Sequence, residues 1–166
     1  MATESDRVDT YPFIAYNFAV EINVPDIETV LCQAAFSECD GLEMTMDVKT
    51  IREGGNNTRQ IRLIGPASYG VVTLKRGMTA NFDLWDWFDA QQYGSPKQLR
   101  SRLRGEAKVA LLSSDRKKVK ALFTLKGCLL TKLKAPPLNA KDGVVAIEEL
   151  QLTYESMSFE AGGGNA

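Results

Sequence analysis

Residues 50–88 constrain the fold of this 166-residue chain more than any other segment. The run Gly-Gly-Asn-Asn at residues 54–57 lies between two stretches that alternate apolar and polar side chains, a pattern typical of a turn joining two strands. We therefore predict a long hairpin arm with residues 54–57 at its tip. The alternation slips at Thr50-Ile51, which predicts a β-bulge at that position.

The same two-residue alternation predicts strands elsewhere in the chain. In residues 17–24, apolar side chains occupy every second position, as a half-buried strand requires. Further strands are predicted at residues 69–75, 108–112, 119–134 and 144–159. We expect Gly65-Pro66 to end the extended segment that precedes the first of these strands. We expect Glu148-Glu149 to shift the register of the last strand.

Residues 81–93 carry the strongest helical pattern in the chain. Leu84, Trp85 and Phe88 share one face of this helix. We therefore expect Trp85 to cover the β-core, whereas Trp87 points elsewhere and is expected to meet a loop or another chain.

Residues 119–134 are apolar on both faces, and Gly127 predicts a bend within them. Such a strand needs cover on both sides, which we expect from the helix on one side and a neighbouring subunit on the other. The sequence therefore predicts a mainly β (α+β) fold, an antiparallel β-barrel or sandwich with one principal packed α-helix.

Composition is that of a single globular domain, with 44% hydrophobic residues and no long uncharged apolar run. We expect a flexible N-terminus at residues 1–10, one domain at residues 11–160 and a flexible tail at residues 161–166. The first residues lack a basic start followed by an apolar stretch, so no secretory signal or membrane anchor is expected. We expect the protein to remain in the cytoplasm during assembly.

Residues suited to catalysis are scarce. The chain has no histidine, which removes the commonest general base and zinc ligand. Cys32, Cys39 and Cys128 do not have a metal-ligand spacing and are expected to be plain reduced thiols. Three acidic residues of the helix, at three-residue spacing, match a solvated face: Asp83, Asp86 and Asp89. We therefore expect no enzyme activity, cofactor or metal, although a carboxylate-only mechanism stays open.

Basic residues gather in two places, residues 97–104 and 116–120, and the first of these predicts a short second helix. Their simplest interpretation is solvation of a helix and a sheet edge. The alternative is a nucleic-acid-binding β-barrel, although a formal net charge of −1 and the lack of interleaved aromatic residues argue against it.

Several runs, taken in their order, resemble the T4-type tail tube family. The resemblance extends from Tyr11 to Glu155, and its most specific parts are Arg-Glu-Gly-Gly-Asn-Asn at residues 52–57 and Leu-Lys-Arg-Gly at residues 74–77. The other matching runs are Tyr-Gly at 69–70, Leu-Trp-Asp-Trp at 84–87, Leu-Asn-Ala at 138–140 and Ala-Ile-Glu-Glu-Leu at 146–150. This family includes the inner tube proteins of contractile phage tails, tailocins and phage-tail-like injection particles, and it is similar in fold to the tube protein of type VI secretion.

The resemblance implies a structural subunit whose copies form six-membered rings, stacked into a hollow tube inside a contractile sheath. The arm at residues 44–63 is then expected to reach an adjacent subunit or ring. Its predicted contact residues are Arg52, Glu53, Gly54, Gly55, Asn56 and Asn57. The implied partners are further copies of the chain, a sheath protein, baseplate or hub proteins, tube-terminating proteins and a DNA or protein cargo. A tube-initiating paralogue at the baseplate is the alternative role within the same kind of particle.

Overall fold

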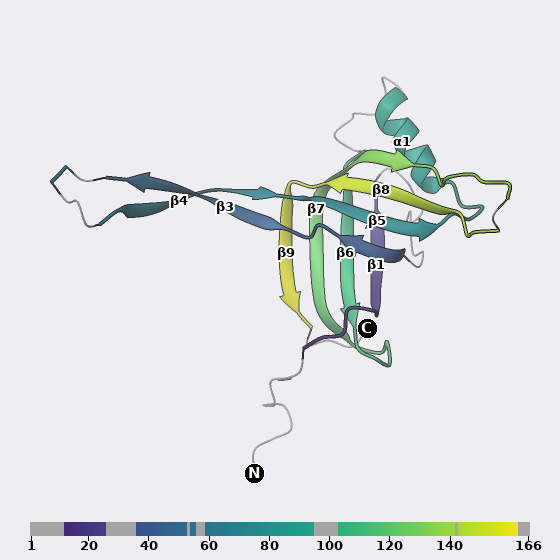
Figure 1. Cartoon of the computed structure of the whole chain (residues 1–166), viewed down its shortest axis with the longest axis horizontal. Coiled ribbons are helices and arrows are strands. Elements are labelled where there is room, and N and C mark those ends of the chain that lie inside the picture. Colours follow the sequence, from purple (N-terminus) through teal and green to yellow (C-terminus); the bar gives the residue numbers. More distant parts are fainter. Residues whose placement is uncertain are drawn as a thin grey trace, which may run out of the picture.

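The computed structural model describes residues 12–25, 36–52, 54–55, 59–94, 103–141 and 143–162, whose strands form two antiparallel sheets and a ribbon (Figure 1). The first sheet contains β1 (Phe18–Asn23), β6 (Gly105–Leu112), β7 (Val119–Lys134) and β9 (Ser156–Ala161). The second contains the far half of β7, then β8 (Ile147–Thr153), β5 (Val71–Gly77) and β2 (Phe36–Asp40). The ribbon consists of β3 (Met44–Ile51) and β4 (Ile61–Tyr69), and the helix is α1 (Asp83–Tyr93). This architecture confirms the predicted mainly antiparallel β class with a packed helix.

Strand β7 belongs to both sheets because it bends at Gly127. Its first half pairs with β6 and β9, and its second half, from Leu129 on, pairs with β8. Gly127 has a φ of +69°, and a Cβ at this position would lie 2.8 Å from Cγ of Glu155. The positive φ favours glycine at this position, because residues with a Cβ rarely adopt the left-handed region. The predicted bend is confirmed.

The apolar core lies between the two sheets, whose strands cross one another in Figure 1. In β1, the predicted alternation is confirmed, since Val20 and Ile22 are buried while Glu21 and Asn23 are exposed. The second sheet contributes Val72, Leu74, Leu150 and Leu152, all of them fully buried. Each such side chain contributes about 1.5–3 kcal/mol to folding through removal of its surface from water.

The helix buries a different face from the one predicted. Leu84 and Trp87 are fully buried, and the indole Nε1 of Trp87 donates a hydrogen bond to the carbonyl of Leu103 at 2.9 Å. Trp85 is half-buried at the edge of the core. The prediction that Trp87 points away from the core was therefore wrong, because Leu84 and Trp87, three residues apart, define the inward face.

The prediction of one long strand at residues 144–159 with a register change at Glu148-Glu149 was also wrong. β8 and β9 are separate strands, and β8 keeps an unbroken register with β5 from Ile147 to Thr153. Glu148 lies on the same buried face as Leu150 and Leu152. It occupies a core position because Arg76 pairs with it there.

Two predictions about the ribbon were also wrong. β4 continues through Gly65-Pro66, and the bulge lies between Met46 and Val48 instead of at Thr50-Ile51. At the bulge, Gly65 and Pro66 together face the single residue Asp47. Proline lacks an N–H donor and is tolerated where the ladder is interrupted, so the bulge accommodates it without ending the strand.

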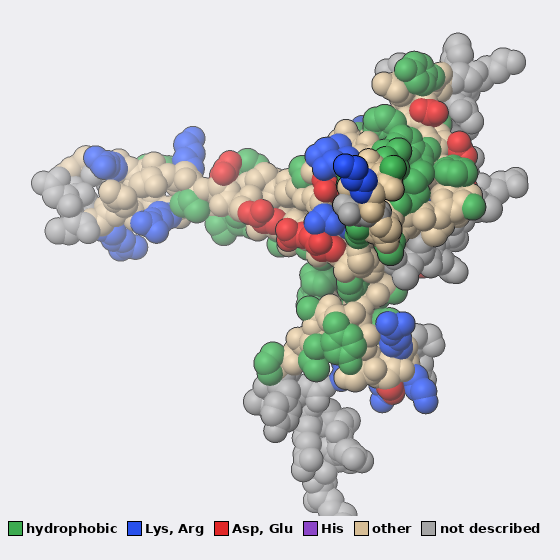
Figure 2. All heavy atoms as spheres, turned by 45° about the vertical axis from the view of Figure 1, so that its right-hand side comes forward, with side chains coloured by type: hydrophobic (Ala, Val, Ile, Leu, Met, Phe, Trp, Pro, Cys, Tyr) green, Lys and Arg blue, Asp and Glu red, His purple; other side chains and the backbone are tan. Residues whose placement is uncertain are grey.

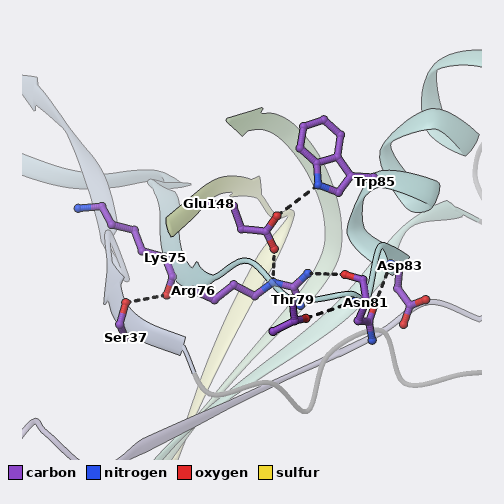
Figure 3. A network of polar contacts seen from close by, with 8 residues as sticks. All are labelled: Ser37, Lys75, Arg76, Thr79, Asn81, Asp83, Trp85 and Glu148. Atoms are coloured by element: carbon purple, nitrogen blue, oxygen red, sulfur yellow. Dashed lines mark hydrogen bonds and ion pairs between the residues drawn. The ribbon is translucent and has the colours of Figure 1, made fainter. Parts of the chain in front are cut away.

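Arg76, Glu148 and Trp85 form a buried polar network that joins the second sheet to the start of α1 (Figure 3). The guanidinium of Arg76 also donates a hydrogen bond to the carbonyl of Asn81 at 3.3 Å. The Oδ1 of Asn81 in turn accepts a hydrogen bond from the backbone N–H of Asp83 at 2.9 Å, in the first turn of the helix. The network therefore sets where α1 begins relative to the sheet.

Most of the basic helix predicted at residues 97–104 lies outside the described residues. Within the described part of the chain, no helix has the length and apolar character needed to cross a membrane.

Candidate assembly interface

The ribbon of β3 and β4 extends away from the two sheets as an arm (Figure 1). Every residue of β3 is exposed. An isolated two-stranded ribbon has no core of its own and is marginal in water. The arm therefore presents both of its faces for contact with another molecule.

One face of the arm carries an apolar stripe. Cross-strand pairs place Met44 beside Tyr69, Met46 beside Ala67 and Val48 beside Ile64. Val48 is 60% exposed and Ile64 is 80% exposed. The opposite face is polar near the root, where Thr45 and Ser68 hydrogen-bond at 2.8 Å. A row of exposed methionine and branched side chains marks an interaction surface, because soluble proteins seldom leave such a row open to water.

Charge is distributed unevenly along the arm (Figure 2). Its outer part carries the exposed basic residues Lys49, Arg52, Arg59 and Arg62. Near its root lie the acidic residues Asp40, Glu43 and Asp47. A partner surface suited to the outer part would therefore present acidic groups, and one suited to the root would present basic groups.

The described members of the predicted contact set lie at the tip of the arm. Arg52, Gly54 and Gly55 are exposed, whereas Glu53, Asn56 and Asn57 lie outside the described residues. A Cβ at Gly54 or Gly55 would have no other atom within 4 Å, and Gly55 has a φ of +94°. The tip is a glycine turn in open space, as predicted. The apolar stripe was not among the predicted contact residues, although its alternation of methionine and valine was visible in the sequence.

The root of the arm is held to the second sheet by Tyr154. Its hydroxyl donates a hydrogen bond to the carbonyl of Glu43 at 2.9 Å, and its ring lies against that of Tyr69 with centroids 5.4 Å apart. Burial raises the pKa of Tyr154, so the phenol keeps its donating proton. Gly41 lets the chain before β3 pass close to the backbone of β5, since a Cβ at this position would lie 2.1 Å from the carbonyl oxygen of Val71. These contacts fix the direction in which the arm leaves the body.

The side chains that could carry out chemistry are poorly suited to catalysis. Burial raises the pKa of both Cys39 and Cys128 to about 11, so these thiols stay protonated near neutral pH and are weak nucleophiles. The described residues contain no cluster of acidic or thiol side chains able to hold a metal ion. Cys32 lies outside the described residues.

The second predicted basic cluster lies in the turn between β6 and β7, where Arg116, Lys117 and Lys118 are exposed. Asn17 closes this turn by donating hydrogen bonds from its Nδ2 to the carbonyls of Ser113 and Ser114. From the first predicted cluster the structure describes Arg104, which forms an ion pair with Glu155.

The sequence of this chain matches a known protein family. Residues 14–158 match the family model described as T4-like virus tail tube protein gp19. No curated protein sequence matches the chain at a significant level.

Solved structures share the fold along almost the whole chain. A chain of the anti-feeding prophage baseplate, 6-fold symmetrised, superposes with a TM-score of 0.77 and 24% sequence identity, covering 92% of this chain and 97% of that one. A chain of an extracellular contractile injection system, the PVC sheath–tube complex in the extended state, superposes with a TM-score of 0.72 and 20% identity, covering 97% and 99%. A chain of the anti-feeding prophage tube-terminating cap superposes with a TM-score of 0.72 and 19% identity, again covering 97% and 99%.

Proposed function

The chain belongs to the T4-like virus tail tube protein family, and we propose that it is an inner-tube subunit of a contractile tail or phage-tail-like particle, arranged in stacked six-membered rings. The observation that carries the proposal is the family match over residues 14–158, which includes the whole arm. The role is mechanical, and thiols that stay protonated near neutral pH fit a protein without catalytic chemistry.

The arm supports assembly through its shape and exposure. An exposed apolar stripe on a projecting ribbon gains free energy only when another surface covers it. We propose that this surface belongs to an adjacent subunit or ring, and that the tip residues 52–57 take part in the contact. Obligate interfaces of this kind typically bury on the order of 2,000 Å² or more, which a body with a long arm can supply.

Further partners are proposed from the assemblies in which the similar chains were solved. These assemblies are described as a baseplate, a sheath–tube complex and a tube-terminating cap. We propose corresponding contacts for this chain with a sheath outside the tube and with baseplate and terminating proteins at its ends. DNA or protein cargo would pass through the hollow centre, and assembly would take place in the cytoplasm.

Mass measurement and negative-stain imaging of the purified protein test the proposal. We expect rings, and short stacks of rings at higher concentration. A protein that stays monomeric at all concentrations, and that forms no ring when mixed with the sheath and baseplate proteins of the same particle, would overturn it.

A tube-initiating paralogue at the baseplate is the second candidate. It is favoured by the description of one of the similar chains, which was solved as part of a baseplate. A bulk tube subunit should extend its own stacks without limit, whereas an initiator should stop after one ring and require a different tube protein to continue. The length of stacks grown from purified protein separates the two roles.

A further inference from the structure

Two rows of side chains cross all four strands of the second sheet on its solvent-facing side, opposite the buried leucines Leu74 and Leu150. Residues paired in register across β2, β5, β8 and β7 define both rows. The first row is Glu38, Lys75, Glu149 and Lys134. The second row is Asp40, Thr73, Gln151 and Lys132.

Within the sheet, neighbouring charges in these rows have opposite sign. Nζ of Lys75 lies 2.9 Å from Oε2 of Glu38, and Nζ of Lys132 lies 3.5 Å from Oε1 of Glu149. The hydrogen bond and charge of Glu38 raise the pKa of Lys75, and the charges of Glu149 and Asp40 raise it further. Acidic and basic side chains alternate on this face beside the root of the arm (Figure 2).

The two rows end with opposite charges on opposite sides of the sheet. Both end in a carboxylate on β2, Glu38 and Asp40, which we call the β2 rim. Both end in an ammonium group on β7, Lys132 and Lys134, which we call the β7 rim. Among the described residues, β2 pairs with β5 alone, and the Leu129–Lys134 half of β7 pairs with β8 alone. Each rim therefore borders a strand edge to which another chain can add.

We propose that the β2 rim of one copy lies against the β7 rim of the next copy in the ring, with Glu38 opposite Lys134 and Asp40 opposite Lys132. This contact rests on the proposed function, because it specifies how neighbouring subunits of one ring meet. The same contact repeats around the ring, since each copy carries both rims.

Strand direction agrees with this register. Each strand of this four-stranded sheet is antiparallel to its neighbour, so β2 and β7 of one copy run in opposite directions. The copies of a ring share one orientation, and the β2 of the next copy therefore runs antiparallel to β7. In an antiparallel pair, residue numbers rise on one strand as they fall on the other. Glu38 and Asp40 then meet Lys134 and Lys132 in that order. Neighbouring strands lie about 4.7–4.9 Å apart, which brings these side chains within reach of ion pairing.

Charge reversal tests the contact. One variant, Glu38→Lys with Asp40→Lys, makes both rims basic, and the other, Lys132→Glu with Lys134→Glu, makes both rims acidic. We expect each variant alone to lose ring formation by at least about tenfold at low salt, because like charges then face each other. An equal mixture of the two should regain rings, since alternating copies restore opposite charges at every contact and a six-membered ring can alternate.

Matched controls keep the charge change but move it away from the rims. Lys117→Glu with Lys118→Glu lies in the turn between β6 and β7, and Asp86→Lys with Asp89→Lys lies on the exposed side of α1. Both controls should form rings as the wild-type chain does, and unfolding midpoints should show that every variant is folded.

The outcomes separate this contact from the proposed function. Rings formed by both rim variants alone, or an equal mixture that fails to regain rings, would overturn the rim contact while leaving the tube function in place. A wild-type chain that forms no ring with or without its sheath and baseplate proteins would instead overturn the tube function.

Discussion

Arg76 on β5 and Glu148 on β8, 72 positions apart in the sequence, form an ion pair in which each side chain is only 1% exposed (Figure 3). The second carboxylate oxygen of Glu148 accepts a hydrogen bond from Nε1 of Trp85 at 3.2 Å. These three residues come from three of the runs that carry the resemblance to tail tube proteins, residues 74–77, 84–87 and 146–150. In this chain, one buried network joins these three runs.

We expect Glu148→Ala to destabilise the fold by about 3–5 kcal/mol, because it leaves the guanidinium of Arg76 buried without its counter-charge. Urea unfolding followed by circular dichroism measures the change. The matched control is Glu149→Ala, one position along on the solvent-facing side of β8, which should cost about 0–1 kcal/mol. Equal losses in the two variants would contradict the assigned role of the buried pair.

The two tryptophans should differ sharply in their effect on stability. Trp87→Ala removes a fully buried ring and its hydrogen bond to Leu103, so we expect a loss of about 3–5 kcal/mol. Trp85→Phe keeps an aromatic ring and removes the hydrogen bond to Glu148, which should cost about 1–3 kcal/mol because the acceptor is charged. Urea midpoints of the two variants, compared at a common slope, check the ranking.

Tyr154→Phe should loosen the arm more than the body. The variant removes the hydroxyl that donates to the carbonyl of Glu43 and keeps the ring contact with Tyr69, so we expect about 0.5–1.5 kcal/mol of destabilisation. Hydrogen exchange should become faster in β3 and β4 while exchange in β6 and the first half of β7 stays unchanged. Uniformly faster exchange throughout the chain would show that Tyr154 supports the core instead of the arm root.

Stability should fall as pH rises from 9 to 11. Burial raises the pKa of Cys39 and Cys128 to about 11 in the folded chain, from an ordinary value of 9.0. In this window the unfolded chain releases its thiol protons and the folded chain keeps them, so the free energy of unfolding decreases with pH. Urea unfolding at pH 8, 9, 10 and 11 measures the slope. The variant Cys39→Ala with Cys128→Ala should lose less stability over that range than the wild-type chain does.

Replacing Gly54 and Gly55 with valine should impair stacking more than folding. Both glycines lie at the exposed tip, away from the core, although valine at Gly55 must accept an unfavourable positive φ. We expect the melting temperature by circular dichroism to change by a few degrees at most, with stack formation by negative stain reduced at least about tenfold. A collapse of the melting temperature with normal stacking would show that the tip serves the fold and not assembly.

The sequence by itself determined the features that depend on local periodicity and turn chemistry. Alternation in residues 17–24 identified β1, the glycine-rich run at residues 54–57 identified the arm tip, and Gly127 identified the bend of β7. These features depend on side chains a few residues apart, which the order of the chain already specifies. The family resemblance was also visible in the sequence, in a different set of runs whose most specific parts are residues 52–57 and 74–77.

Only the tertiary structure decided which polar groups belong in the core and which strands break. The sequence predicted a register change at Glu148-Glu149, but Glu148 stays in the core because Arg76 pairs with it across the sheet. The sequence also predicted a strand break at Gly65-Pro66, but a bulge opposite Asp47 accommodates these two residues within β4. The indole N–H of Trp87 is satisfied on the inward face of the helix because the carbonyl of Leu103 accepts its hydrogen bond. Each outcome depends on a partner distant in the sequence, since the free energy of burying a charge, an indole N–H or a proline is set by what lies against it.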